Sequence, residues 1–263
     1  MRGRKNAFND WLDALQASGR YTFTSLVVAQ EAPSVERTAI WRVRRDDRLI
    51  QPRNGFFVIV PPEYRAVGAP PASWFIDDLM RFEKLPYYVG LLSAASLHGA
   101  SPQAVQEFQI VTSKPRRPIS AGRLRIRFLM RSDIAAAATA DRQTHTGTMR
   151  VSTVEQTTLD LVRYPLAAGG WDNVAAVVQE LAPQIDPKAL ARLVKKQREA
   201  APVQRLGYLL ERVAHSDEPA RALRTWLNAR ALRYVPLERR AGAAGAPRDE
   251  RWHLIVNRPI QVD

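Results

Sequence analysis

The sequence has no cysteine, and this absence removes several kinds of chemistry at once. A chain without thiols forms no disulfide, no thiolate metal site and no cysteine nucleophile. Histidine is also scarce, because the four residues His98, His145, His215 and His253 are scattered without the spacing of a metal centre. We therefore expect no metal site and no cofactor.

Long apolar runs are absent as well. No stretch of about 18 or more apolar residues occurs, and no apolar segment follows the basic N-terminal residues in the manner of a signal peptide. The sequence therefore predicts a cytoplasmic protein without a membrane partner. Hydrophobic residues still make up 46% of the 263 residues, which is enough to bury substantial cores in one to three domains.

Acidic residues are the minority among the charged ones. The 26 Asp and Glu residues face 39 Lys and Arg residues, so the formal net charge is +13. Such an excess favours polyanionic partners, nucleic acid above all.

Residues 24–45 show the pattern of a helix-turn-helix. Thr24 or Ser25 can cap a short helix, and Pro33 prevents its continuation. Ser34 is then expected to cap a second, strongly basic helix.

A hairpin and a first helix complete the predicted module. Residues 49–60 place the Asn54-Gly55 turn between two extended runs, which is the strongest short hairpin signal in a sequence. Near the N-terminus, apolar residues at helical spacing predict another helix: Phe8, Trp11, Leu12 and Leu15. We therefore expect residues 1–63 to form a winged helix-turn-helix DNA-binding domain.

The basic helix after Ser34 has two different faces. Its apolar residues, among them Ile40 and Val43, should pack on the preceding helices. The opposite face and the hairpin tip carry polar and basic residues that can meet base edges or phosphates. The predicted DNA-binding residues are Ser34, Arg37, Thr38, Trp41, Arg44, Arg45, Arg48, Arg53 and Asn54. The alternatives are a solvated helix face and, for Trp41, a packing role.

The rest of the chain predicts a larger mixed domain, so that the fold class is α+β. Residues 64–71 contain glycine and proline and are interpreted as a linker, and residues 72–263 follow as the C-terminal domain. Within that domain we expect helices over 74–98, strands at 108–112 and 123–130, and mainly helices from 171 to 233.

The strand at 123–130 alternates charged and apolar residues. Its three arginines should therefore share one face of a sheet. With the preceding basic loop they form a possible additional contact for DNA or a protein partner: Lys114, Arg116, Arg117, Arg123, Arg125 and Arg127. A solvated face neutralised by acidic residues explains the pattern equally well.

Four further segments and the winged module make the chain similar to a known family. These segments are LLSAASLHG at 91–99, QIVTS at 109–113, VSTVEQTTLDLV at 151–162 and VQRLGYLLE at 203–211. Their order resembles the AbiEi family of antitoxins from type IV toxin-antitoxin systems. Asp46-Asp47 departs from the basic residue and glycine that often follow the recognition helix in relatives.

The resemblance implies both a function and partners. A bacterial protein of this type is a transcriptional repressor that binds its own double-stranded promoter DNA, with inverted repeats as half-sites. Its C-terminal domain counters a nucleotidyltransferase-like toxin, and a stable complex with that toxin is not required.

Polar residues in these segments also have structural interpretations. Ser152 and Glu155 have the spacing of a capping box, and Asp160 is expected to pair with Arg163 or Arg205. His98 is interpreted as a helix-end side chain. The remaining candidate partner contacts are Arg205, Tyr208 and Glu211.

Two enzyme classes find no support among the residues. A restriction-type nuclease requires an acidic-x-Lys pair, which Glu107-Phe-Gln109 lacks. Phosphoryl transfer by a P-loop requires a lysine and a hydroxyl residue after the glycines, and the segment 242–245 has neither. We therefore expect no catalytic residue. A generic winged-helix regulator without antitoxin activity is the first alternative, and a nucleic-acid-processing enzyme is the second.

Overall fold

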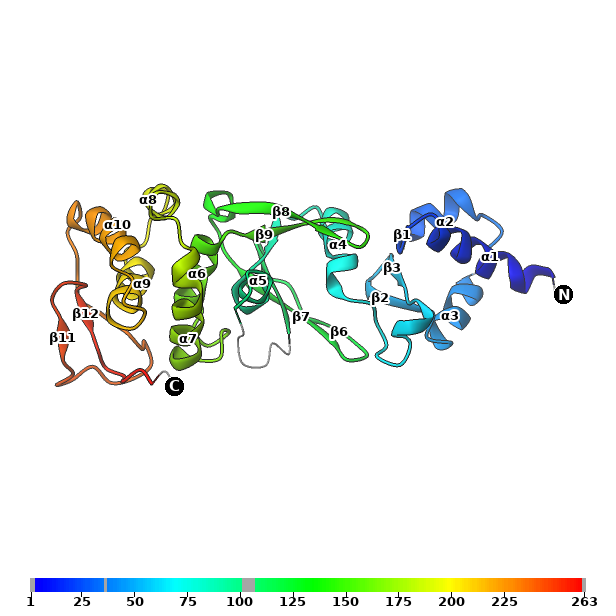
Figure 1. Ribbon diagram of the computed structural model, residues 1–263. Helices are drawn as coiled ribbons and strands as arrows, with labels where there is room; N and C mark the ends of the chain where they lie inside the picture. Colours follow the sequence, from blue (N-terminus) through cyan, green and yellow to red (C-terminus); the bar gives the residue numbers. More distant parts are fainter. Residues whose placement is uncertain (1–2, 36, 101–106, 262–263) are drawn as a thin grey trace. The chain divides into compact units, whose positions relative to one another are not determined.

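The computed structural model describes residues 3–35, 37–100 and 107–261 (Figure 1). Helices account for 43% of the chain and strands for 19%, which confirms the α+β class. Within the described ranges, no helix is both long and apolar enough to cross a membrane.

The chain divides into two compact units, which are described separately. Unit 1 comprises Met1–Tyr88, Gln106–Ser132 and Asp141–Arg150, and unit 2 comprises Val89–Val105, Asp133–Ala140 and Val151–Asp263. Residues 1–63 thus lie wholly within unit 1. The expected boundary at residues 64–71 does not coincide with the division between the units.

The first part of unit 1 has the predicted order of helices and hairpin. Its elements are α1 (Gly3–Ala17), β1 (Thr22–Thr24), α2 (Ser25–Glu31), α3 (Arg37–Arg45), β2 (Leu49–Arg53) and β3 (Phe56–Ile59), with the strands ordered β1-β3-β2. Thr24 caps α2 as expected, because its hydroxyl accepts a hydrogen bond from the Val27 N–H at 3.3 Å. Ser34 does not cap α3, since that helix begins at Arg37 and Ser34 lies in the preceding turn.

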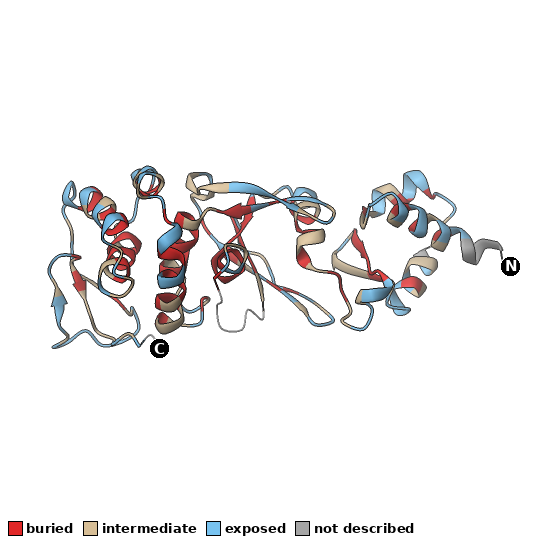
Figure 2. Ribbon diagram, in the orientation of Figure 1, coloured by how far each residue is buried: buried red, intermediate tan, exposed pale blue. Residues whose placement is uncertain are grey.

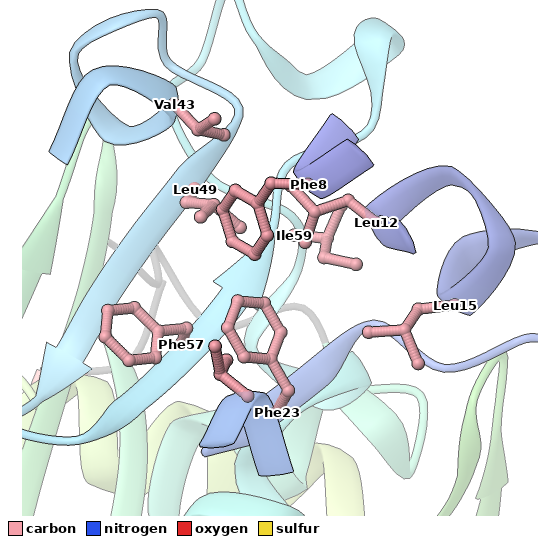
Figure 3. Packing of buried hydrophobic residues seen from close by; sticks show 9 residues of the cluster. Phe8, Leu12, Leu15, Phe23, Val43, Leu49, Phe57 and Ile59 are labelled. Atoms are coloured by element: carbon pink, nitrogen blue, oxygen red, sulfur yellow. The ribbon is translucent and has the colours of Figure 1, made fainter. Parts of the chain in front are cut away.

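A single hydrophobic cluster holds these elements together (Figure 3). It contains the apolar stripe predicted for α1, and Val43 contributes the inner face of α3. Phe23 stacks on Phe57 with ring centroids 5.2 Å apart, which joins β1 to β3. The basic face of α3 is consequently turned away from this core.

The end of α3 shows how the chain enters the hairpin without a glycine. Asp47 donates its N–H to the Arg44 carbonyl and Arg48 donates to the Val43 carbonyl, both at 3.1 Å. This is the pattern of a Schellman motif, and Asp47 adopts the left-handed conformation with φ of 53°. Asp47 therefore occupies the helix-end position at which glycine is generally favoured.

The segment expected to be a linker is instead folded against the rest of unit 1. Two short 3-10 helices flank it, η1 (Pro62–Tyr64) and η2 (Ala72–Trp74). The Val67 carbonyl accepts a hydrogen bond from the Arg123 N–H at 2.8 Å, and the backbones of Gly68 and Gly122 meet so closely that no Cβ fits between them. The winged module is thus fixed to the turn before the basic strand.

The six strands that follow in the chain form one sheet with the order β6-β7-β5-β4-β9-β8. These strands and two associated helices are α4 (Ile76–Phe82), β4 (Tyr87–Val89), α5 (Leu91–Leu97), β5 (Phe108–Thr112), β6 (Ile119–Ala121), β7 (Leu124–Met130), β8 (Thr139–Thr144) and β9 (Gly147–Ser152). In β7, Arg125 and Arg127 are exposed and Ile126 is buried, as the alternation predicts. The expected helical stretch at 74–98 is interrupted by β4, a strand that the sequence did not indicate.

Unit 2 is mainly helical, with a small sheet near the C-terminus (Figure 2). Its remaining elements are η3 (Ile134–Ala136), α6 (Val154–Arg163), α7 (Trp171–Leu181), η4 (Ala182–Gln184), α8 (Pro187–Lys195), α9 (Ala201–Arg212), α10 (Asp217–Asn228), β10 (Val235–Pro236), β11 (Arg248–Asp249) and β12 (Leu254–Ile255).

The expected capping box of α6 is wrong. Thr153, not Ser152, is the N-cap residue, and Glu155 accepts a hydrogen bond from the Asp186 N–H at 3.1 Å. His98 has the expected helix-end position, with its Nε2 2.8 Å from the Ser152 carbonyl.

One face of α9 holds the C-terminal segment of unit 2. The amide of Gln204 donates to the carbonyls of Arg233, Trp252 and His253, and Glu211 accepts from the Trp252 indole N–H at 2.8 Å. Arg205 is buried and donates to the Pro236 carbonyl, at 2.8 Å from Nη2. Burial lowers the pKa of Arg205 to about 10, so its guanidinium stays protonated at neutral pH. Arg205 and Glu211 therefore serve the fold.

Candidate nucleic-acid interface

A groove of about 620 Å³ runs beside α3 in unit 1. One wall is formed by Trp41, Arg44 and Arg45 of α3 and by the whole of β2. The other wall is formed by residues 118–121, which include β6. Sequence reasoning missed this second wall, because only three residues, between Pro118 and Gly122, form the strand.

Three α3 side chains predicted to meet DNA line this groove. Trp41 is 59% exposed, so the packing role considered for it is not what the structure shows. The guanidinium of Arg45 lies over the Trp41 ring at 5.3 Å from its centroid. Arg44 is exposed and donates to the Gln51 side chain at 2.8 Å, which orients its guanidinium. Thr38 is exposed on the same helix, and the Arg37 side chain lies outside the described residues.

Two other predicted DNA contacts are engaged within the protein. Arg48 donates to the Asn9 side chain at 2.7 Å and pairs with Asp13, so it fixes the end of α3 to α1. Arg53 donates to Glu83 at 3.0 Å and to the Arg117 carbonyl at 2.7 Å. The Arg53 guanidinium is thus held within the protein, while Asn54 and Ser34 are exposed.

Glu83 binds one arginine at the hairpin tip and one in the basic loop that precedes β6. Its carboxylate is 11% exposed and binds Arg53 through Oε1 at 3.0 Å and Arg116 through Oε2 at 3.1 Å. The Arg53 guanidinium also lies over the Phe128 ring at 5.4 Å. Because the pair of arginines shares one carboxylate, the two walls of the groove are held together at this end.

The additional basic residues have different surroundings. Lys114, Arg117 and Arg123 are exposed, whereas Arg116 is paired with Glu83. Arg125 donates to the Gly122 and Leu124 carbonyls, and Arg127 lies 3.3 Å from Glu107. The solvated-face interpretation therefore gains support at Arg127 only.

The chemistry of the groove is aromatic and cationic. None of the described residues that line it is acidic, and it combines an exposed indole with guanidinium groups. In the described ranges, no group of three His, Asp or Glu side chains could hold a metal ion. Such a surface is suited to nucleic acid, whose bases and phosphates complement these groups.

Comparison with known proteins identifies both the fold and a domain. The crystal structure of the RV2827C protein from Mycobacterium tuberculosis has a similar fold, with a TM-score of 0.65 over 92% of this chain and 88% of that protein at 19% identity. No curated protein matches the sequence significantly. Residues 88–212 match the model of the AbiEi antitoxin C-terminal domain. This stretch of the chain is therefore similar to the C-terminal domain of AbiEi antitoxins.

Proposed function

We propose that this protein is the antitoxin of a type IV toxin-antitoxin operon and the repressor of that operon. It acts in the cytoplasm and counters a nucleotidyltransferase-like toxin encoded beside it. The observation that carries the antitoxin role is the match of residues 88–212 to the antitoxin domain. Repression is supported by the helix-turn-helix order and by the basic outer face of α3.

The proposed repression works by occlusion of the promoter. α3 enters a major groove with Thr38, Arg44 and Arg45 toward the base edges, and bound protein keeps polymerase from the DNA. Arg37 is proposed for the same surface because it is the first residue of α3. Arg48 and Arg53 act indirectly, since they fix α3 and the hairpin through bonds within the protein.

A gel-shift titration with the promoter region of the gene tests the DNA-binding role. We expect the double variant Arg44→Ala, Arg45→Ala to bind the promoter at least tenfold more weakly, since a bidentate base contact contributes about 1–3 kcal/mol. Arg42→Ala is the matched control, because Arg42 lies on the same helix but not in the groove. Equal affinity of all three proteins would remove α3 from the recognition role.

Growth rescue tests the antitoxin role independently. Cells that express the adjacent toxin gene should recover when the α3 double variant is co-expressed, if neutralisation does not depend on DNA binding. A substitution variant is preferable to a truncated chain in this experiment. A chain that starts at residue 72 lacks Val67 and Gly68, which pack on the β6–β7 turn. Promoter binding without any rescue would favour the generic regulator.

A further inference from the structure

We propose that the groove beside α3 binds one unstacked nucleotide, with its base on the Trp41 indole and its phosphate at Arg44 and Arg45. The site rests on the proposed function, because the same face of α3 is assigned to nucleic acid. It goes further in that the groove has a second ligand, an unpaired nucleotide, which uses Arg44 and Arg45 when no duplex is bound to them.

The base platform is Trp41. A single exposed apolar side chain is common on protein surfaces, but this indole also borders a groove. The Arg45 guanidinium lies over one face of the ring, so the base is assigned to the opposite face. Pro52 and Pro118 are among the lining residues and add apolar surface without extra backbone donors. Every nucleobase has a face that stacks on such a ring, which makes the platform tolerant of base identity.

The phosphate site is built from two guanidiniums. Arg44 is oriented by its 2.8 Å hydrogen bond to Gln51, and Arg45 lies over one face of the Trp41 ring. Both cations line the same groove as the indole whose other face would receive the base. The described lining residues include no carboxylate, so no negative charge among them repels an anion that enters the groove.

The second wall supplies polar groups for the edge of the base. β6 is the outer strand of its sheet, and among the described strands it pairs only with β7. β6 lines the groove, and the edge that does not pair with β7 leaves backbone donors and acceptors for a ligand, close to the exposed side chain of Ser120. A base within a duplex has its pairing edge occupied, so these groups favour an unpaired base.

The size of the groove agrees with this ligand. Its volume of about 620 Å³ lies within the range of roughly 300–1,000 Å³ that is usual for small-ligand sites. The nucleotide can come from two sources, a free mononucleotide or an unpaired residue of a nucleic-acid strand, and both present the same base and phosphate.

Calorimetric titration of the full chain tests the site. The probes are AMP, GMP, CMP and UMP, adenosine, ribose 5-phosphate, an oligothymidylate of about eight nucleotides and a blunt duplex. We expect the mononucleotides to bind at least tenfold more tightly than adenosine or ribose 5-phosphate, because only they offer base and phosphate together. If the oligothymidylate binds tenfold more tightly than UMP, the source is a strand; equal affinities identify the free nucleotide.

Variants of the groove assign the binding to its residues. Trp41→Leu and the double variant Arg44→Gln, Arg45→Gln should each weaken nucleotide binding at least tenfold, whereas Trp41→Phe should stay within about threefold of the wild type. Arg42→Gln, on the same helix outside the groove, should bind as the wild type does.

The results that would overturn the nucleotide site are different from those that would overturn the proposed repression. Promoter binding without any mononucleotide binding, or equal binding by Trp41→Leu and wild type, would overturn the nucleotide site and leave repression intact. Nucleotide binding with no affinity for the promoter would uphold the site and reject repression.

Discussion

Gly207 lies in the middle of α9, where glycine is ordinarily unfavourable. A Cβ at this position would overlap the six-membered ring of Trp252, which is fully buried. Gln204 and Glu211 lie three residues before and four residues after it on the same helix and bind the backbone and the indole of the same tryptophan. The absence of a side chain at Gly207 therefore lets the C-terminal segment dock on α9.

Replacement of this glycine should destabilise the protein although it raises helix propensity. We expect Gly207→Ala to lower the free energy of unfolding by about 1–3 kcal/mol, the usual cost of overpacking a core. We expect this net loss even after the gain of about 1 kcal/mol that alanine brings to a helix interior, because the added Cβ would lie only 1.9 Å from an atom of the Trp252 ring. Urea unfolding followed by tryptophan fluorescence measures the change. Gly242→Ala is the control, because no atom lies within 4 Å of a Cβ built there, and it should change stability by less than about 0.5 kcal/mol.

The β2–β3 hairpin was expected to be a wing that contacts DNA, and in the structure its tip is bound to neighbouring elements. Besides the bonds of Arg53 to Glu83 and the Arg117 carbonyl, Phe56 lies 5.4 Å from Phe82 of α4 between ring centroids. Glu83 immediately follows α4, so the end of this short helix receives both the hairpin and the basic loop. The hairpin is thus a structural bridge between the helix-turn-helix and β6.

Removal of the charge on Glu83 should loosen this bridge. We expect Glu83→Gln to lower the free energy of unfolding by about 1–3 kcal/mol, because two partly buried guanidiniums lose their shared carboxylate. This loss of stability should be smaller than the loss on breaking a fully buried ion pair, since the Arg116 side chain is 32% exposed. Glu63→Gln, an exposed acidic residue in η1, controls for the change in net charge. Equal unfolding midpoints for the two variants in urea would contradict a bridging role for Glu83.

Long periodic or turn-marked elements could be predicted from the sequence, and short ones could not. α1, the β2–β3 hairpin, β5 and β7 each carry a local signal, either an apolar stripe, an Asn-Gly turn or a run of β-forming residues. β4 and β6 have three residues each, and β8 is mostly polar, so their strand character depends on pairing with distant segments. Because the sequence did not predict β6, it did not predict the second wall of the groove either.

The candidate site was predictable to the extent that helix geometry determines it. The spacing of Trp41, Arg44 and Arg45 placed them on the outer face of α3, where the structure has them. Arg48 and Arg53 could not be separated from this set, because their partners Asp13 and Glu83 are 35 and 30 residues away in the sequence. Long-range ion pairs leave no periodic pattern from which they could be inferred.

At the scale of the whole molecule, the net charge of +13 alone would give affinity for any polyanion. Local phosphate contacts make a different contribution, since the removal of one such contact should lower the slope of log K against log salt by about 0.9. Arg123 and Arg125 are exposed near the groove wall formed by β6, whereas Arg127 is paired with Glu107. A DNA surface that extends to this strand should therefore depend on the first two arginines.

The salt dependence of binding to promoter and scrambled duplexes separates these contributions. We expect Arg123→Gln, Arg125→Gln to reduce the slope by about 1.8 on both duplexes, because phosphate contacts position the protein without reading sequence. The control is Lys188→Gln, Lys195→Gln in α8, which removes the same charge from exposed positions in unit 2. An equal change in both variants would mean that net charge governs binding. An unchanged slope in the arginine variant would confine DNA contacts to the winged module.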